Sequence, residues 1–280
     1  MSISINTSAA SLSIMRELSD SQTRMSSSMK RLSTGLRINN GSDDAAGMTV
    51  SQNLLNQVSS NRTALGNIND GLSLISITES SLGEISEILL RLRNLSLQSA
   101  NGSMSATDRI ALNIEFEEMS NSTNGAIKGI LESALFNEAR LIDNGIPAPS
   151  TLQIGWQSTD QYNITAKDYS GFITTLDSLD ISTDTAALNA IGNPGGIDAF
   201  IDEINRYRAE LGSDQNTLDS IKTNLETNID KTAIARGRII DADYAREATA
   251  LAREQMKQEI GVSILRQVQD SLGLVLQLIK

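Results

Sequence analysis

Residues 197–229 read IDAFIDEINRYRAELGSDQNTLDSIKTNLETNI and contain the strongest periodic pattern in the chain. Five apolar residues recur there every seven positions: Ile197, Ile204, Leu211, Leu218 and Leu225. Two more, Ile201 and Ile229, occupy the second apolar position of the heptad. Such a heptad repeat is typical of a helix that packs along a second helix in a coiled coil. The pattern therefore predicts a helix over about 197–230 that needs a partner of comparable length.

A second heptad pattern, in the first half of the chain, supplies this partner. Its residues are Ile68, Ile75, Leu82 and Leu89. The pattern predicts a helix over about 49–101 that ends at Asn101-Gly102, because a glycine after asparagine is a common helix stop. A third helix is expected over about 105–130, where Ser105 or Thr107 can cap the first turn.

The centre of the chain interrupts the helical pattern. All three prolines lie within residues 147–194, and proline breaks the interior of a helix. Apolar residues alternate in Leu152-Gln-Ile154 and in Tyr162-Asn-Ile164, which is the period of a β-strand. We therefore expect a short β-hairpin region over about 150–180.

Both ends of the chain carry apolar helix faces of their own. Near the N-terminus, Leu18, Met25 and Leu32 are seven residues apart. Near the C-terminus, apolar residues fill every face of the last two helical turns, so that segment needs burial on all sides. The residues expected to form an assembly interface are Leu18, Met25, Met29, Leu32, Leu265, Val268, Leu272, Val275, Leu276 and Ile279.

Together these patterns predict a mainly α fold. We expect a long antiparallel helical coiled-coil rod with a short β-hairpin element, plus a terminal two-helix coiled-coil domain. The stretch from Gly35 to Gly47 contains three glycines and turn-forming Asn-Gly and Ser-Asp pairs, so we expect a hinge there. Aromatic residues are 3% of the chain, which suits long helices with aliphatic seams better than a compact core.

The composition excludes several classes of function. Cysteine and histidine are both absent, which removes thiolate and imidazole chemistry and the usual zinc sites. We therefore expect no catalytic, cofactor-binding or metal site, and an enzyme is the least favoured class. The net charge of -11 argues against nucleic-acid binding. No membrane span is expected, because no stretch approaches the roughly 20 apolar residues that a span needs.

Motifs at both ends of the chain resemble the signatures of bacterial flagellins. On the N-terminal side they are Leu32-Ser-Thr-Gly-Leu-Arg-Ile-Asn39, Asp43-Asp-Ala-Ala-Gly47, Asn69-Asp-Gly71 and Arg91-Leu-Arg-Asn-Leu-Ser-Leu-Gln-Ser-Ala-Asn101. On the C-terminal side they are Arg238-Ile-Ile-Asp-Ala-Asp-Tyr-Ala-Arg-Glu247 and Gly261-Val-Ser-Ile-Leu265. The short centre of the chain resembles a minimal member of this family that lacks large outer domains.

The resemblance implies a structural subunit that self-assembles into the bacterial flagellar filament for swimming motility. It implies that residues 1–47 are the N-terminal half of an inner terminal domain with its hinge, that 48–234 are a rod domain, and that 235–280 are the second hinge and the C-terminal half of the inner domain. The implied location is extracellular, reached by type III export without a cleaved signal peptide. The implied partners are copies of the chain, an export chaperone at the C-terminal segment, and hook-associated junction and cap proteins.

The family resemblance also implies an epitope for the mammalian Toll-like receptor that senses flagellin. Arg91, Leu95, Gln98 and Glu115 stand at the receptor-contacting positions of the family. The alternative for this segment is a solvated end of a long helix with no recognition role.

A second function within the same family is kept open. Hook-associated junction proteins share the terminal helices but are present in few copies. Polymerisation on filament seeds distinguishes the two, because a filament subunit elongates the seeds and a junction protein does not.

The C-terminal segment gives a first test. Replacement of Leu272 and Leu276 by Ala should prevent polymerisation, because each truncation of a fully buried leucine costs about 2–5 kcal/mol. The central helices should stay folded, since distant sites behave nearly independently. Circular dichroism of the monomer and a sedimentation assay of assembly measure the two effects. Polymerisation of the double variant at the parent's level would contradict the prediction.

Overall fold

The computed structural model describes the backbone of residues 9–142, 150–164 and 167–278, and the side chains of 11–142, 151–164 and 167–270. The chain forms two compact units. The terminal unit consists of residues 1–58 and 230–280, and the central unit consists of residues 59–229.

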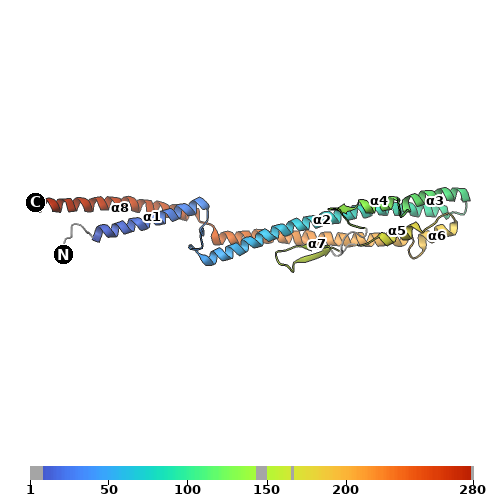
Figure 1. Ribbon diagram of the computed structural model, residues 1–280, viewed down its shortest axis with the longest axis horizontal. Helices are drawn as coiled ribbons and strands as arrows, with labels where there is room; N and C mark the ends of the chain where they lie inside the picture. Colours follow the sequence, from blue (N-terminus) through green and yellow to red (C-terminus); the bar gives the residue numbers. More distant parts are fainter. Residues whose placement is uncertain (1–8, 143–149, 165–166, 279–280) are drawn as a thin grey trace. The chain divides into compact units, whose positions relative to one another are not determined.

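Two long helices form the centre of the central unit. Helix α2 (Ala45–Ser99) and helix α7 (Ile197–Ile240) run side by side there (Figure 1). Arg93, near the end of α2, pairs with Asp198, near the start of α7, and its Nε lies 2.6 Å from the carboxylate. The two helices are therefore antiparallel, as the heptad patterns predict.

The heptad residues of α2 and α7 form the core of this unit. On α2, Ile68, Ile75, Leu82 and Leu89 are fully buried. On α7, Ile197, Ile204, Leu211, Leu218 and Leu225 are all less than a tenth exposed. The predicted coiled-coil pair is thus confirmed, and α7 extends ten residues beyond the expected end at 230.

The helix expected over about 105–130 is divided in two. Helix α3 (Ala106–Ser120) begins with a capping box, in which Ser105 Oγ accepts from the backbone N–H of Asp108. The helix ends because Asn121 Oδ1 accepts from the backbone N–H groups of Thr123 and Asn124, which makes a turn. Helix α4 (Ala126–Ser133) starts after this turn. The prediction of one continuous helix missed the turn-forming asparagine.

The hairpin region is shorter than the predicted 150–180. Strands β3 (Ser150–Gln153) and β4 (Gln161–Ile164) pair antiparallel, with Leu152 opposite Tyr162. A second, two-residue hairpin joins β1 (Leu135–Phe136) to β2 (Ala139–Arg140). Beyond β4 the chain forms the short helices α5 (Ser170–Asp177) and α6 (Asp184–Gly192), which the sequence reading did not predict.

The β3–β4 hairpin is attached to both long helices. Asn67 of α2 donates its side-chain N–H to the carbonyl of Gln153 at 3.0 Å, and the Tyr162 hydroxyl donates to Asp214 of α7 at 2.7 Å. Gly71 of α2 lies directly beneath Leu152, where a Cβ would collide with the leucine side chain. Trp156, at the turn of this hairpin, is 52% exposed.

Aromatic side chains gather at one place in the central unit. Tyr169 and Phe172, at the start of α5, contact Tyr207 and Phe200 of α7, and the Phe172 and Phe200 rings are 4.1 Å apart. All four residues are buried. This cluster fixes the short helix α5 against α7.

The terminal unit contains helix α1 (Ala9–Thr34) and helix α8 (Tyr244–Leu278). The predicted boundary at 234/235 falls inside helix α7, and the break before α8 lies at residues 241–243 instead. The N-terminal hinge pairs with this break. Arg37 donates its backbone N–H to Ile240, and Ala242 donates to Gly35, at 2.6 and 2.9 Å.

Two adjacent leucines of α2 allow a test of whether the heptad seam is the core of the central unit. Leu89 is fully buried and Leu90 is 49% exposed. Leu89→Ala should lower the free energy of unfolding by about 2–5 kcal/mol, because it leaves a cavity in the seam. Leu90→Ala should change it by less than about 0.5 kcal/mol. Urea denaturation of the monomer, followed by circular dichroism, measures both, and equal losses would show that the seam is not the core.

Candidate assembly interface

Helices α1 and α8 lie side by side and pack against each other (Figure 1). Leu18, Met25 and Leu32 are half-buried on the face of α1 that carries the buried Ser21 and Ser28. Half-buried residues of α8 share a face with the buried Glu254, and these are Leu251, Leu265 and Val268. The structure therefore places five of the predicted interface residues in a seam within the chain.

The other predicted interface residues are differently placed. Met29, on α1, is 55% exposed. Leu272, Val275 and Leu276 belong to α8, but their side chains lie outside the described residues, and so does Ile279 altogether. Their part in assembly stays a prediction.

A second set of apolar residues lies on α1 and α8 beside the seam and remains largely exposed. These residues are 42–59% exposed: Leu12, Met15, Met256, Ile260, Val262 and Ile264. The sequence reading missed them because heptad spacing selects the residues that face the partner helix within the chain. The available signal was the presence of apolar residues off the heptad positions, where an isolated two-helix pair would carry polar ones.

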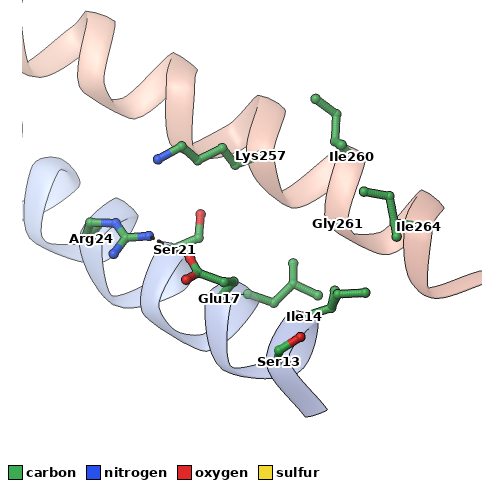
Figure 2. A pocket seen from close by; sticks show the side chains of 10 residues that line it. Ser13, Ile14, Glu17, Ser21, Arg24, Lys257, Ile260, Gly261 and Ile264 are labelled. Atoms are coloured by element: carbon green, nitrogen blue, oxygen red, sulfur yellow. Dashed lines mark ion pairs between the residues drawn. The ribbon is translucent and has the colours of Figure 1, made fainter. Parts of the chain in front are cut away.

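A groove of about 310 Å³ opens between α1 and α8 next to these residues (Figure 2). Ile14 and Leu18 line it from α1, and Ile260, Gly261 and Ile264 line it from α8. A Cβ added at Gly261 would lie 3.0 Å from Leu18 Cδ2, so the glycine allows the leucine to approach the backbone of α8. The groove is apolar at this end and is bordered by charged side chains at the other.

A buried carboxylate lies at the charged end of the groove. Glu254 of α8 is 7% exposed and accepts hydrogen bonds from Ser21 Oγ at 2.9 Å, Arg24 Nε at 3.2 Å and Lys257 Nζ at 2.9 Å. The hydrogen bond from Lys257 is the largest cause that lowers the pKa of Glu254 to about 2, and the bonds from Ser21 and Arg24 lower it further against the effect of burial. The carboxylate is therefore charged at neutral pH and fully satisfied within the α1–α8 pair.

The comparisons with known proteins match both parts of this helical framework. The bacterial flagellin N-terminal helical region matches residues 5–145, which is half of the chain, and the bacterial flagellin C-terminal helical region matches residues 195–279. The chain belongs to the bacterial flagellin family.

Individual flagellins agree over nearly the full length. The flagellin of Halalkalibacterium halodurans is 33% identical over 254 residues, which cover 90% of each chain. The flagellar filament 33 kDa core protein of Treponema phagedenis is 30% identical over 294 residues, and the flagellin of Bacillus subtilis is 29% identical over 306 residues, each covering 99% of both chains. The chain is thus a structural subunit of the flagellar filament, which lies outside the cell, and this confirms the prediction.

The predicted receptor-contacting residues differ in how exposed they are. Arg91 donates from Nε and Nη2 to the carboxylate of Glu115 on α3, at 3.0 and 2.5 Å, and both side chains are about half exposed. Gln98 is exposed as well, whereas Leu95 is 2% exposed and belongs to the core. In the single chain, Arg91, Gln98 and Glu115 are accessible to a partner and Leu95 is not.

The part of the chain that the structure describes holds no group of three or more metal-binding side chains. None of its helices is long and apolar enough to cross a membrane. Flagellins are structural proteins, and both family matches fall mainly on the helical framework described above.

The lowered pKa of Glu254 predicts a particular acid response. The charged form stabilises the α1–α8 pair, so its contribution is complete above the ordinary pKa of 4.5 and is lost as the pH falls toward about 2. Glu254→Gln should remove this pH-dependent contribution and flatten the helicity profile between pH 5 and pH 2.

The acid response is measured by circular dichroism and sedimentation of assembled protein across that pH range. Glu259→Gln is the control, because Glu259 is exposed on the same helix. A profile of the Glu254→Gln protein with the same slope as the parent's would show that the buried carboxylate does not contribute.

Proposed function

We propose that the chain polymerises with copies of itself through the exposed apolar residues of α1 and α8. The observation that supports this most is their position. They lie on both helices, beside a seam that already satisfies the pairing of α1 with α8. Apolar residues in such numbers on two adjacent helices call for a covering surface, and a filament of identical subunits supplies it.

The charge distribution supports the same arrangement. Residues 1–47 and 235–280 each carry a net charge of +1, whereas residues 48–234 carry -13. Crowding of many copies is least costly where the charge is near zero, and repulsion between acidic surfaces is smallest where they face solvent. The terminal unit is therefore the part that packs at high density.

The remaining partners are proposed from the family. The C-terminal segment, with Leu272, Val275, Leu276 and Ile279, is the binding site for an export chaperone before assembly. The chain leaves the cell through the flagellar export apparatus without a cleaved signal peptide, and its filament ends contact hook-associated junction and cap proteins. Arg91, Gln98 and Glu115 form the accessible part of the epitope for the Toll-like flagellin receptor, with Leu95 beneath them.

The exposed apolar residues give the direct test of polymerisation. If a neighbouring subunit covers Ile260 and Ile264, burial of each side chain contributes up to roughly 1.5–3 kcal/mol to the free energy of assembly. Ile260→Ser with Ile264→Ser should therefore raise the critical concentration for seeded elongation on the order of a hundredfold.

Leu188→Ser is the matched control for this test. Leu188 is 59% exposed, as is Ile260, but it lies on helix α6 of the central unit. Light scattering after addition of filament seeds gives the critical concentration. An unchanged value in the double variant would reject this surface. Failure of the parent itself to elongate seeds would favour the hook-associated junction role.

A further inference from the structure

The contacts of Glu254 occur a second time, one heptad further along the α1–α8 pair. Ser28 Oγ donates to Glu247 at 2.9 Å and Arg31 Nη1 donates at 3.1 Å. The serine and arginine lie seven residues later on α1, and the glutamate lies seven residues earlier on α8. Because the two helices are antiparallel, this is the same three-residue contact repeated at the next layer of the seam. We call each set of one serine, one arginine and one glutamate a clamp.

Both clamps lie inside the seam. Ser21 and Ser28 are 2% and 8% exposed, and the side chains of Glu254 and Glu247 are 9% and 12% exposed. The small serines occupy positions that a coiled coil normally fills with leucine or isoleucine. Burial of charged groups in this way adds little net stability compared with apolar residues of similar size. The best-attested use of such groups is to fix helix register and partner choice.

The next layer of the seam shows what a change of register would cost. One heptad before Ser21 and Arg24, the corresponding positions are Ile14 and Glu17. A slide of seven residues, roughly 10 Å, in one direction would carry Glu254 to this isoleucine and this second carboxylate. A slide in the other direction would carry Glu247 past Thr34, the last residue of α1. Only the observed register satisfies both glutamates.

The same arrangement disfavours pairing of like helices. Two copies of α8 packed along this face would bring the carboxylates of Glu247 and Glu254 together, with Lys257 of the same helix beside Glu254 but without the serine and arginine that each carboxylate contacts on α1. Two copies of α1 would bring Arg24 and Arg31 together. Like charges placed opposite each other disfavour an interface, so both homotypic pairs are less favourable than α1 with α8.

We propose that the two clamps are specificity-determining contacts of filament assembly, which restrict α1 to an α8 helix and to one register. The inference rests on the proposed self-assembly, because many copies of both helices meet only there. The exposed apolar residues supply attraction between subunits, and the clamps decide which helices pair and how they align.

Charge reversal on one helix and on both tests partner choice. Arg24→Glu with Arg31→Glu, or Glu247→Arg with Glu254→Arg, should each lower the rate of seeded elongation at least tenfold. The combination of all four should recover the rate to within about threefold of the parent. Arg16→Glu with Glu259→Arg is the control, because both residues are exposed on the same helices, and its rate should stay within twofold.

Cysteine cross-linking tests the register independently, because the chain has no native cysteine. Leu18→Cys with Gly261→Cys reports the observed register, since these two residues are in contact. Met25→Cys with Gly261→Cys reports a slide of one heptad. The parent filament should form only the first cross-link. Glu247→Gln with Glu254→Gln keeps the side-chain shape but removes the charge, and it should form both.

The outcomes separate the two proposals. If the parent does not elongate seeds, self-assembly itself fails. If the parent elongates and both one-sided reversals elongate equally well, the clamps do not choose the partner. If the fourfold reversal does not recover the rate of elongation, the cross-linking result decides whether the clamps set the register. Formation of only the Leu18→Cys–Gly261→Cys cross-link in the glutamine variant would overturn that role.

Discussion

Aliphatic heptads buried against a second helix of the same chain are the interaction on which this structure depends. Most of the stability of a helix in a protein comes from the packing of its apolar face, and the chain has few aromatic residues with which to build a compact core. The core is therefore a line of isoleucines and leucines along α2 and α7. The β3–β4 hairpin and the aromatic cluster that holds α5 around Phe200 attach to this line and do not replace it.

The two units use the heptad in different ways. In the central unit the heptad positions of the seam hold isoleucine and leucine, and the β3–β4 hairpin is attached to both helices. In the terminal unit the seam contains serines that face glutamates, and apolar residues remain outside it. The first arrangement favours stability within one chain. The second leaves part of the apolar surface for other subunits while it keeps the pairing of α1 with α8 selective.

Periodicity predicted the long helices well and the short elements poorly. The heptads from Ile68 to Leu89 and from Ile197 to Leu225 are buried as expected, because many weak preferences add up over such lengths. The break at Asn121 and the start of α6 depend on single capping residues, and α5 depends on tertiary contacts, none of which a repeat reveals. In the candidate interface, heptad spacing identified the seam within the chain. It could not identify the outer residues such as Ile260, because their role is defined by exposure, which only the packed pair shows.

The hairpin turn has a practical consequence. Trp156 is the only tryptophan in the chain, and it lies half exposed at the turn of a hairpin that is held to both α2 and α7. Its indole therefore reports on one defined point of the surface, with no second fluorophore of its kind to confuse the emission. Emission wavelength and quenching by small solutes would follow the environment of that point as subunits join a growing filament, without any label.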